Sequence, residues 1–168
     1  MRLMNFFANE TDSDSAGHFN AEDVCSVALI KNGATRSYVD MQMAAGFPAL
    51  RALLVDDEFL IAFDLENSMR ELGFNVCTVA SNEKDAIELA KSNPPDVVVM
   101  DVYLGGTRAG IETARWLRDV CGVPVVFVTA HCEDGSLERI HEAVPGAPVL
   151  SKPVYRDTLA NAVSGALH

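Results

Sequence analysis

Basic residues are scarce in this sequence. Only 13 Lys and Arg stand against 24 Asp and Glu, which gives a formal net charge of -11 and a pI near 4.6. Proteins that bind nucleic acids draw much of their affinity from clustered Lys and Arg that neutralise phosphates. The composition therefore argues against direct DNA binding.

Long hydrophobic runs and cysteine pairs are also missing. No stretch reaches the roughly 18 uninterrupted apolar residues of a membrane-spanning helix, and the first residues lack the pattern of a secretory signal. We therefore expect a cytoplasmic protein without membrane association. The cysteines are widely spaced and form no Cys-x-x-Cys pair, so they indicate neither a zinc site nor a redox motif. They are Cys25, Cys77, Cys121 and Cys132.

The chain is long enough for one ordinary domain and a tail. It has 168 residues, 49% of them hydrophobic, which suits a single packed core. Residues 1–48 are rich in small, polar and acidic residues and show no alternation of strands and helices. We predict an extension over 1–48, irregular or with a short helix after Asn20, and one domain over 49–168.

From residue 51 onward, short apolar runs alternate with amphipathic stretches. The continuous apolar runs indicate strands buried on both faces, so the sequence predicts an α/β fold in which helices cover both faces of a doubly wound, five-stranded parallel sheet. We expect the large aromatic residues Phe59, Phe63, Phe74, Phe127 and Trp116 to pack in the core or between helices. The predicted strands are 51–55, 75–79, 96–100, 124–128 and 148–150. The predicted helices are 59–72, 82–91 (capped by Ser81), 110–120, 133–144 and 155–167.

Polar residues follow the predicted strands at their carboxyl ends, where ligands bind in such sheets. Asp56 and Asp57 follow the first strand, Asp101 the third, Thr129 the fourth and Lys152 the fifth. Carboxylates gathered in one cleft need a divalent cation, and oxygen ligands with a phosphate favour Mg²⁺. Asp101 is the candidate nucleophile of a phosphoryl-transfer site. Thr129 alone could be a strand-end cap, and Lys152 alone could be a surface lysine. The prediction depends on the occurrence of all these residues together at the strand ends.

On these residues, the stretch 51–167 resembles the receiver domain of two-component response regulators. The resemblance implies a flavodoxin-like strand order of 2-1-3-4-5 and phosphorylation of Asp101. It also implies that Mg²⁺ is held by Asp56, Asp57, Asp101 and the backbone carbonyl of Tyr103. Thr129 and Lys152 would then hold the phosphoryl oxygens, and the Lys152-Pro153 peptide would be cis.

One position departs from the family pattern. Receiver domains often have an aromatic residue three positions before the lysine, and here that residue is Val149. The signal would then leave by another route, for example through His131 or Tyr155, or be weaker. The stretch Pro124–Ala130 is also similar to a proteobacterial subgroup of mostly stand-alone receivers.

The resemblance implies a stand-alone phosphorelay protein and not an enzyme beyond its own phosphorylation and slow dephosphorylation. Its expected partners are a sensor histidine kinase or phosphotransfer protein and a downstream protein target, unless it serves as a phosphate sink. A homodimer through the last helix is a further family expectation. The first alternative is a pseudo-receiver that only binds a protein. The second is a hydrolase of the haloacid dehalogenase type, which needs an acid where Tyr103 stands.

Overall fold

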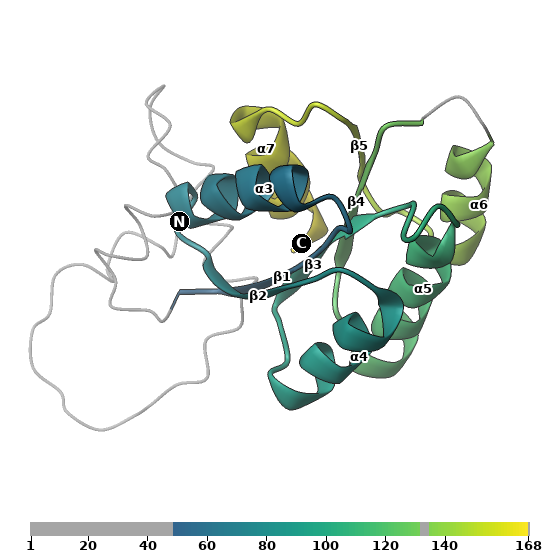
Figure 1. The fold of residues 1–168 in the computed structure, drawn as a ribbon, viewed down its shortest axis with the longest axis horizontal. Helices are drawn as coiled ribbons and strands as arrows, with labels where there is room; N and C mark the ends of the chain where they lie inside the picture. Colours follow the sequence, from purple (N-terminus) through teal and green to yellow (C-terminus); the bar gives the residue numbers. More distant parts are fainter. Residues whose placement is uncertain (1–48, 132–134, 168) are drawn as a thin grey trace, which may run out of the picture.

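The computed structural model of the protein describes residues 49–131 and 135–167. This part is a sheet with helices on either side (Figure 1). In chain order its elements are β1 (Arg51–Val55), α3 (Phe59–Glu71), β2 (Asn75–Ala80), α4 (Glu83–Ser92), β3 (Val97–Asp101), α5 (Ala109–Cys121), β4 (Val125–Thr129), α6 (Ser136–Ala143), β5 (Val149–Ser151) and α7 (Arg156–Ala166).

The five strands are all parallel and lie in the order β2-β1-β3-β4-β5. This order confirms the predicted fold. The two edges of the sheet are irregular or short. β2 has one more residue than β1 between the pairs Ala52–Val76 and Leu53–Thr78, and β5 has only three residues.

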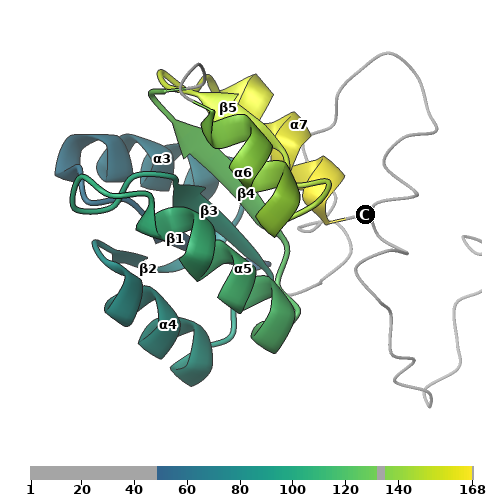
Figure 2. The same ribbon diagram turned by 90° about the vertical axis from the view of Figure 1, so that its right-hand side faces the viewer.

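Helices α4, α5 and α6 lie on one face of the sheet, and α3 and α7 lie on the other (Figure 2). An apolar layer holds the helices to each face. Successive strand residues point to opposite faces. Leu53 and Val55 of β1 therefore pack with α4, α5 and α6, while Ala52 and Leu54 pack with α3 and α7. Both faces of the sheet are buried, as the unbroken apolar runs of the sequence predict.

Helix α4 begins one residue later than the sequence predicts, and Ser81 is not its cap. The cap is Asn82, whose backbone is extended and whose side-chain oxygen accepts a hydrogen bond from the Asp85 amide at 3.0 Å. Ser and Asn are both favoured N-cap residues, so the sequence alone could not decide which of the two caps the helix.

The prediction that Phe59 and Phe63 are buried is wrong. Their exposed fractions are 78% and 52%, and their rings stack on each other on the outer side of α3. Ala62, Leu65 and Met69 form the buried side of this helix. The other aromatic predictions are confirmed. Phe74 and Phe127 are buried, and Trp116 is half-buried beside the Lys91 ammonium, 4.9 Å from the ring centre.

The predicted extension over residues 1–48, with its short helix, lies outside the described residues, as do residues 132–134. α6 begins at Ser136 within the part that is described. None of the helices in the described ranges combines the length and the apolar character needed to cross a membrane.

Candidate functional site

The residues predicted from the strand ends come together in the structure. Asp56 directly follows β1, Asp101 and Thr129 are the last residues of β3 and β4, and Lys152 directly follows β5. Because these strands are parallel neighbours, their carboxyl ends lie together at one end of the sheet. The order of strands therefore assembles the site from four segments that are far apart in sequence.

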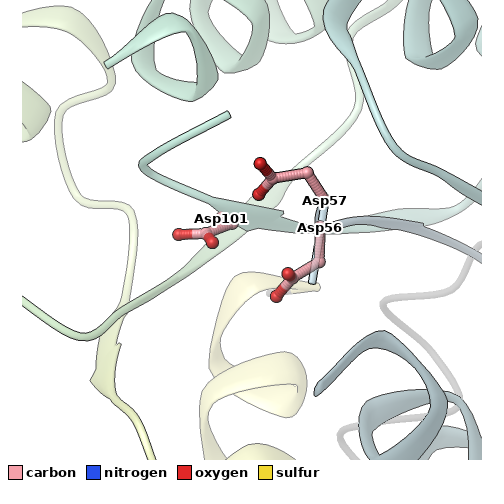
Figure 3. A group of neighbouring side chains, drawn as sticks. All are labelled: Asp56, Asp57 and Asp101. Carbon is pink, nitrogen blue, oxygen red and sulfur yellow. The ribbon is translucent and has the colours of Figure 1, made fainter. Parts of the chain in front are cut away.

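Three carboxylates lie close together at these strand ends (Figure 3). Asp56 and Asp101 are buried, with 2% and 4% of their surface exposed, whereas Asp57 is exposed. Each of the three offers one oxygen, and these oxygens all lie within 4.8 Å of one another. Such a cluster of negative charge is unfavourable unless a cation faces it.

Lys152 supplies one such cation. Its Nζ lies 2.7 Å from Asp101 Oδ2, 2.9 Å from Asp56 Oδ2 and 3.3 Å from Glu58 Oε1. Burial by itself lowers the pKa of Lys152, but the hydrogen bond to Asp101 and the negative charges of Asp101 and Asp56 outweigh it, so that the pKa is raised. The lysine therefore stays protonated at neutral pH and ties β5 to β1 and β3.

Asp56 is less well satisfied than Asp101. Its Oδ1 accepts a hydrogen bond from the Glu58 amide at 2.9 Å. Its Oδ2 is buried without a hydrogen-bond partner, so the short distance to Lys152 marks an ion pair and not an aligned hydrogen bond. Burial raises the pKa of Asp56, and Lys152 only partly offsets this. A buried carboxylate oxygen without a hydrogen bond, beside two other carboxylates, belongs to a donor set that fits Mg²⁺.

Backbone amides of the surrounding loops fix the polar side chains. The Tyr103 amide donates to Asp101 Oδ1 at 3.1 Å, and the Gly105 amide donates to Asp57 Oδ2 at 2.9 Å. Gly105 has a φ of 59°, which a glycine adopts without strain. The His131 amide donates to Thr129 Oγ1 at 3.1 Å, so the hydroxyl hydrogen of Thr129 can be donated elsewhere.

The structure adds two residues to the predicted site. Glu58 reaches Lys152, and its position directly after the acidic pair was the only signal for it. Gly110 allows the first turn of α5 to lie against the backbone of Asp101 and Val102. The predicted cis peptide between Lys152 and Pro153 is confirmed. The role of the Tyr103 carbonyl as a metal ligand stays a prediction.

Comparison with known proteins agrees with this geometry. Residues 52–164 match the family model of the response regulator receiver domain. The chain belongs to this family. The predicted site residues all lie within the matched range.

Two curated relatives are transcriptional regulatory protein PdtaR of Mycobacterium tuberculosis and phyllosphere-induced regulator PhyR of Methylorubrum extorquens. PdtaR is 36% identical over 93 residues, and PhyR is 33% identical over 119 residues. The matches cover 55% and 68% of this chain, but only 45% and 44% of the two relatives. The chain thus spans less than half the length of these relatives.

Solved receiver domains have the same fold. The signal receiver domain of a modulated diguanylate cyclase from Desulfovibrio desulfuricans is 31% identical and superposes with a TM-score of 0.66, covering 72% of this chain and 95% of that one. The PhyR receiver domain of Erythrobacter litoralis is 28% identical with a TM-score of 0.59, covering 71% of this chain and 90% of that one.

Proposed function

We propose that the protein accepts a phosphoryl group on Asp101 in a Mg²⁺-dependent reaction and passes the change on as a signal. The observation that carries the proposal is the constellation around Asp101. The buried carboxylate of Asp101 is held by the Lys152 ammonium, and the carboxylates of Asp56 and Asp57 lie beside it. Membership of the receiver family supports the same reading.

Asp101 is the nucleophile in this proposal. One of its carboxylate oxygens forms a bond to phosphorus, and the bond between phosphorus and the donor breaks, its electron pair leaving with the donor. The Thr129 hydroxyl lies at the end of the neighbouring strand β4, and Lys152, which follows β5, reaches Asp101 Oδ2 with its Nζ at 2.7 Å. Both would face the charge on the phosphoryl oxygens. Asp56, Asp57, Asp101 and the Tyr103 carbonyl would hold Mg²⁺, which when bound neutralises charge on the phosphoryl group.

The phosphoryl donor in this proposal is a sensor histidine kinase or a phosphotransfer protein, and the output is a contact with a protein in the cytoplasm or a role as phosphate sink. The net charge of -11 supports a protein partner over DNA. The expectation that the protein acts alone stays a prediction, because its relatives are each more than twice as long as the part they share with it. A homodimer through α7 also stays a prediction.

A pseudo-receiver is the alternative, because Val149 occupies the position of the family's aromatic residue and lies half-buried in β5. The two functions differ in what Asp101 does. A pseudo-receiver would keep its partner affinity after Asp101→Asn, whereas a phosphorylated switch would lose any change that depends on phosphate.

The test is the intact mass of the protein after incubation with acetyl phosphate and Mg²⁺. We expect one phosphoryl adduct in the unmutated protein, and none in Asp101→Asn or after chelation of Mg²⁺. Asp96→Asn is a matched control, since Asp96 immediately precedes β3 at its other end, and it should form the adduct. If no adduct forms with acetyl phosphate or with histidine kinases, the proposed phosphorylation is wrong and the pseudo-receiver is the remaining function.

A further inference from the structure

The first half of α3 exposes a group of large apolar side chains, here termed the α3 patch. Phe59, Leu60 and Phe63 have exposed fractions of 78%, 77% and 52%. The rings of Phe59 and Phe63 stack with their centres 6.4 Å apart, and Leu60 is a surface neighbour of Phe63 because the two are three positions apart on a helix. Elsewhere in the described residues, Val120 and Tyr155 are exposed singly. Single exposed apolar side chains are ordinary, whereas a contiguous group marks an interaction site.

The α3 patch lies next to the strand ends and has acidic surroundings. Phe59 begins the helix directly after Glu58, whose carboxylate lies 3.3 Å from the Lys152 ammonium. Asp57, Glu58 and Asp64 are all exposed beside the patch in sequence. A segment that covers the patch should therefore be apolar and carry positive charge.

The stretch 1–8 of the same chain has this chemistry. It reads MRLMNFFA, with two adjacent phenylalanines, and its only charged side chain is that of Arg2. A second apolar stretch, 24–30, has two acidic residues before it and one lysine after it, so that residues 22–31 carry a net side-chain charge of -1. Charge complementarity therefore favours the stretch 1–8 as the occupant of the α3 patch.

The chain between the stretch and the domain is long enough for contact within one molecule. Residues 9–48 are forty residues, which can span up to about 130 Å when extended. They lead to Ala49, two residues before β1, and β1 and α3 are only about 17 and 20 Å long. A tether of this kind gives the stretch an effective concentration on the order of 1 mM at the patch, so that even a weak contact is populated.

We propose that residues 1–8 bind the α3 patch of their own chain. Phe6 and Phe7 pack against the rings of Phe59 and Phe63, and Arg2 faces the acidic side chains beside them. The bound stretch covers apolar surface next to the strand ends. The inference goes beyond the proposed function and does not depend on it, because it needs only apolar and charge complementarity between two parts of the chain.

The test is limited chymotrypsin digestion of the full chain under native conditions, followed by mass spectrometry. Chymotrypsin cleaves after accessible phenylalanines, and cleavage follows the population of the open form when opening is fast. Phe19 lies outside the proposed contact and is the internal reference. The cleavage ratio, defined as the rate of cleavage after Phe6 or Phe7 divided by the rate after Phe19, therefore measures how far the stretch 1–8 is covered.

Replacing the two rings of the α3 patch should uncover the stretch. We expect the double variant Phe59→Ser, Phe63→Ser to raise the cleavage ratio by about three- to tenfold, because the apolar surface that binds the stretch is removed. Val120→Ser is the matched control. Val120 is also exposed but lies on α5, so this variant should leave the ratio unchanged.

A charge reversal beside the patch tests the role of Arg2. Asp64→Lys should raise the cleavage ratio by about twofold, because Arg2 then meets a positive charge. Asp119→Lys changes the net charge equally on α5, where Asp119 is exposed, and should have no effect. Urea unfolding of each variant checks that the domain itself is equally stable.

The outcomes separate this inference from the alternatives. An unchanged cleavage ratio in the double variant overturns it and leaves the α3 patch open to another protein. A ratio that falls as the protein concentration rises would place the stretch on a second copy of the chain, which also overturns it, since contact within one chain does not depend on concentration. Absence of a phosphoryl adduct on Asp101 would end the proposed function and leave this inference intact.

Discussion

At the scale of single residues, Gly110 has no room for a side chain. A Cβ built on it would overlap the carbonyl oxygen of Asp101 and lie 2.9 Å from that of Val102. We expect Gly110→Ala to lower the free energy of unfolding by about 2 kcal/mol, because the first turn of α5 must shift away from β3. Urea unfolding measures the change.

Gly165 is the matched control for this substitution. It lies in α7, and nothing comes within 4 Å of its built Cβ. Gly165→Ala should raise the free energy of unfolding by about 0.5 to 1 kcal/mol, because glycine is a poor helix former. Equal effects at both positions would show that α5 can move back from Asp101 without cost.

Asp56 makes stability depend on pH. Burial raises its pKa above the ordinary value of 3.8, so the folded state binds the proton more tightly than the unfolded state does. The tighter binding of this proton stabilises the folded state. This contribution is present in full below pH 3.8 and is lost as the pH rises through the raised pKa of Asp56. In chelator at pH 7, Asp56→Asn should therefore raise the free energy of unfolding by about 1 kcal/mol. This gain should shrink towards acid pH, and the exposed Asp64→Asn should show neither effect.

Mg²⁺ should act on the same residue in the opposite sense. If Asp56 is a ligand, millimolar Mg²⁺ raises the melting temperature of the unmutated protein, because a ligand of the folded state stabilises it by mass action. Asp56→Asn should lose most of this increase. Thermal unfolding with and without Mg²⁺ measures both proteins, and an equal rise in the two would place the cation elsewhere.

At the scale of elements, α3 has two apolar sides of different energetic weight. Leu65 is buried, with 4% of its surface exposed, whereas Phe59 is exposed by 78%. Leu65→Ala should lower the free energy of unfolding by about 3 kcal/mol, and Phe59→Ala should change it by less than about 0.5 kcal/mol. Chemical denaturation of the pair checks this, and a large loss for Phe59→Ala would contradict the exposed position of the ring.

The same helix shows where sequence reasoning ends. The spacing of apolar residues predicted a helix over 59–72, close to its observed bounds. It did not predict which side faces the sheet, because large apolar residues occur around most of its circumference. The small Ala62 faces the core together with Leu65 and Met69, and residue size favoured the wrong side.

The candidate site also has a part that the sequence predicts and a part that it does not. Asp56, Asp57, Asp101, Thr129 and Lys152 could be predicted, because parallel strands bring their carboxyl ends together whatever the details of the loops. The edge contact between the rings of Tyr103 and His131, whose centres lie 5.4 Å apart, could not be predicted. It depends on how two side chains turn in loops 28 positions apart in the sequence, and no periodic pattern reports that orientation.

At the scale of the whole molecule, the described residues carry their own core. Both apolar layers are built from residues between Leu50 and Leu167. We therefore expect a chain starting at Ala49 to fold, with a melting temperature within a few degrees of that of the full chain. Circular dichroism on heating compares the two. A marked loss of stability would assign the first 48 residues a structural role and would contradict the predicted domain boundary.

The two sheet edges have a further consequence for how the molecule meets others. β2 is kinked by its extra residue, and β5 has only three residues. Irregular and short edge strands are poor templates for an added strand, and natural proteins use both devices against aggregation. Neighbouring copies should therefore not join edge to edge into extended sheets at high concentration. A peptide ligand that binds as an extra strand is equally disfavoured, which leaves helices and loops as the surfaces for recognition.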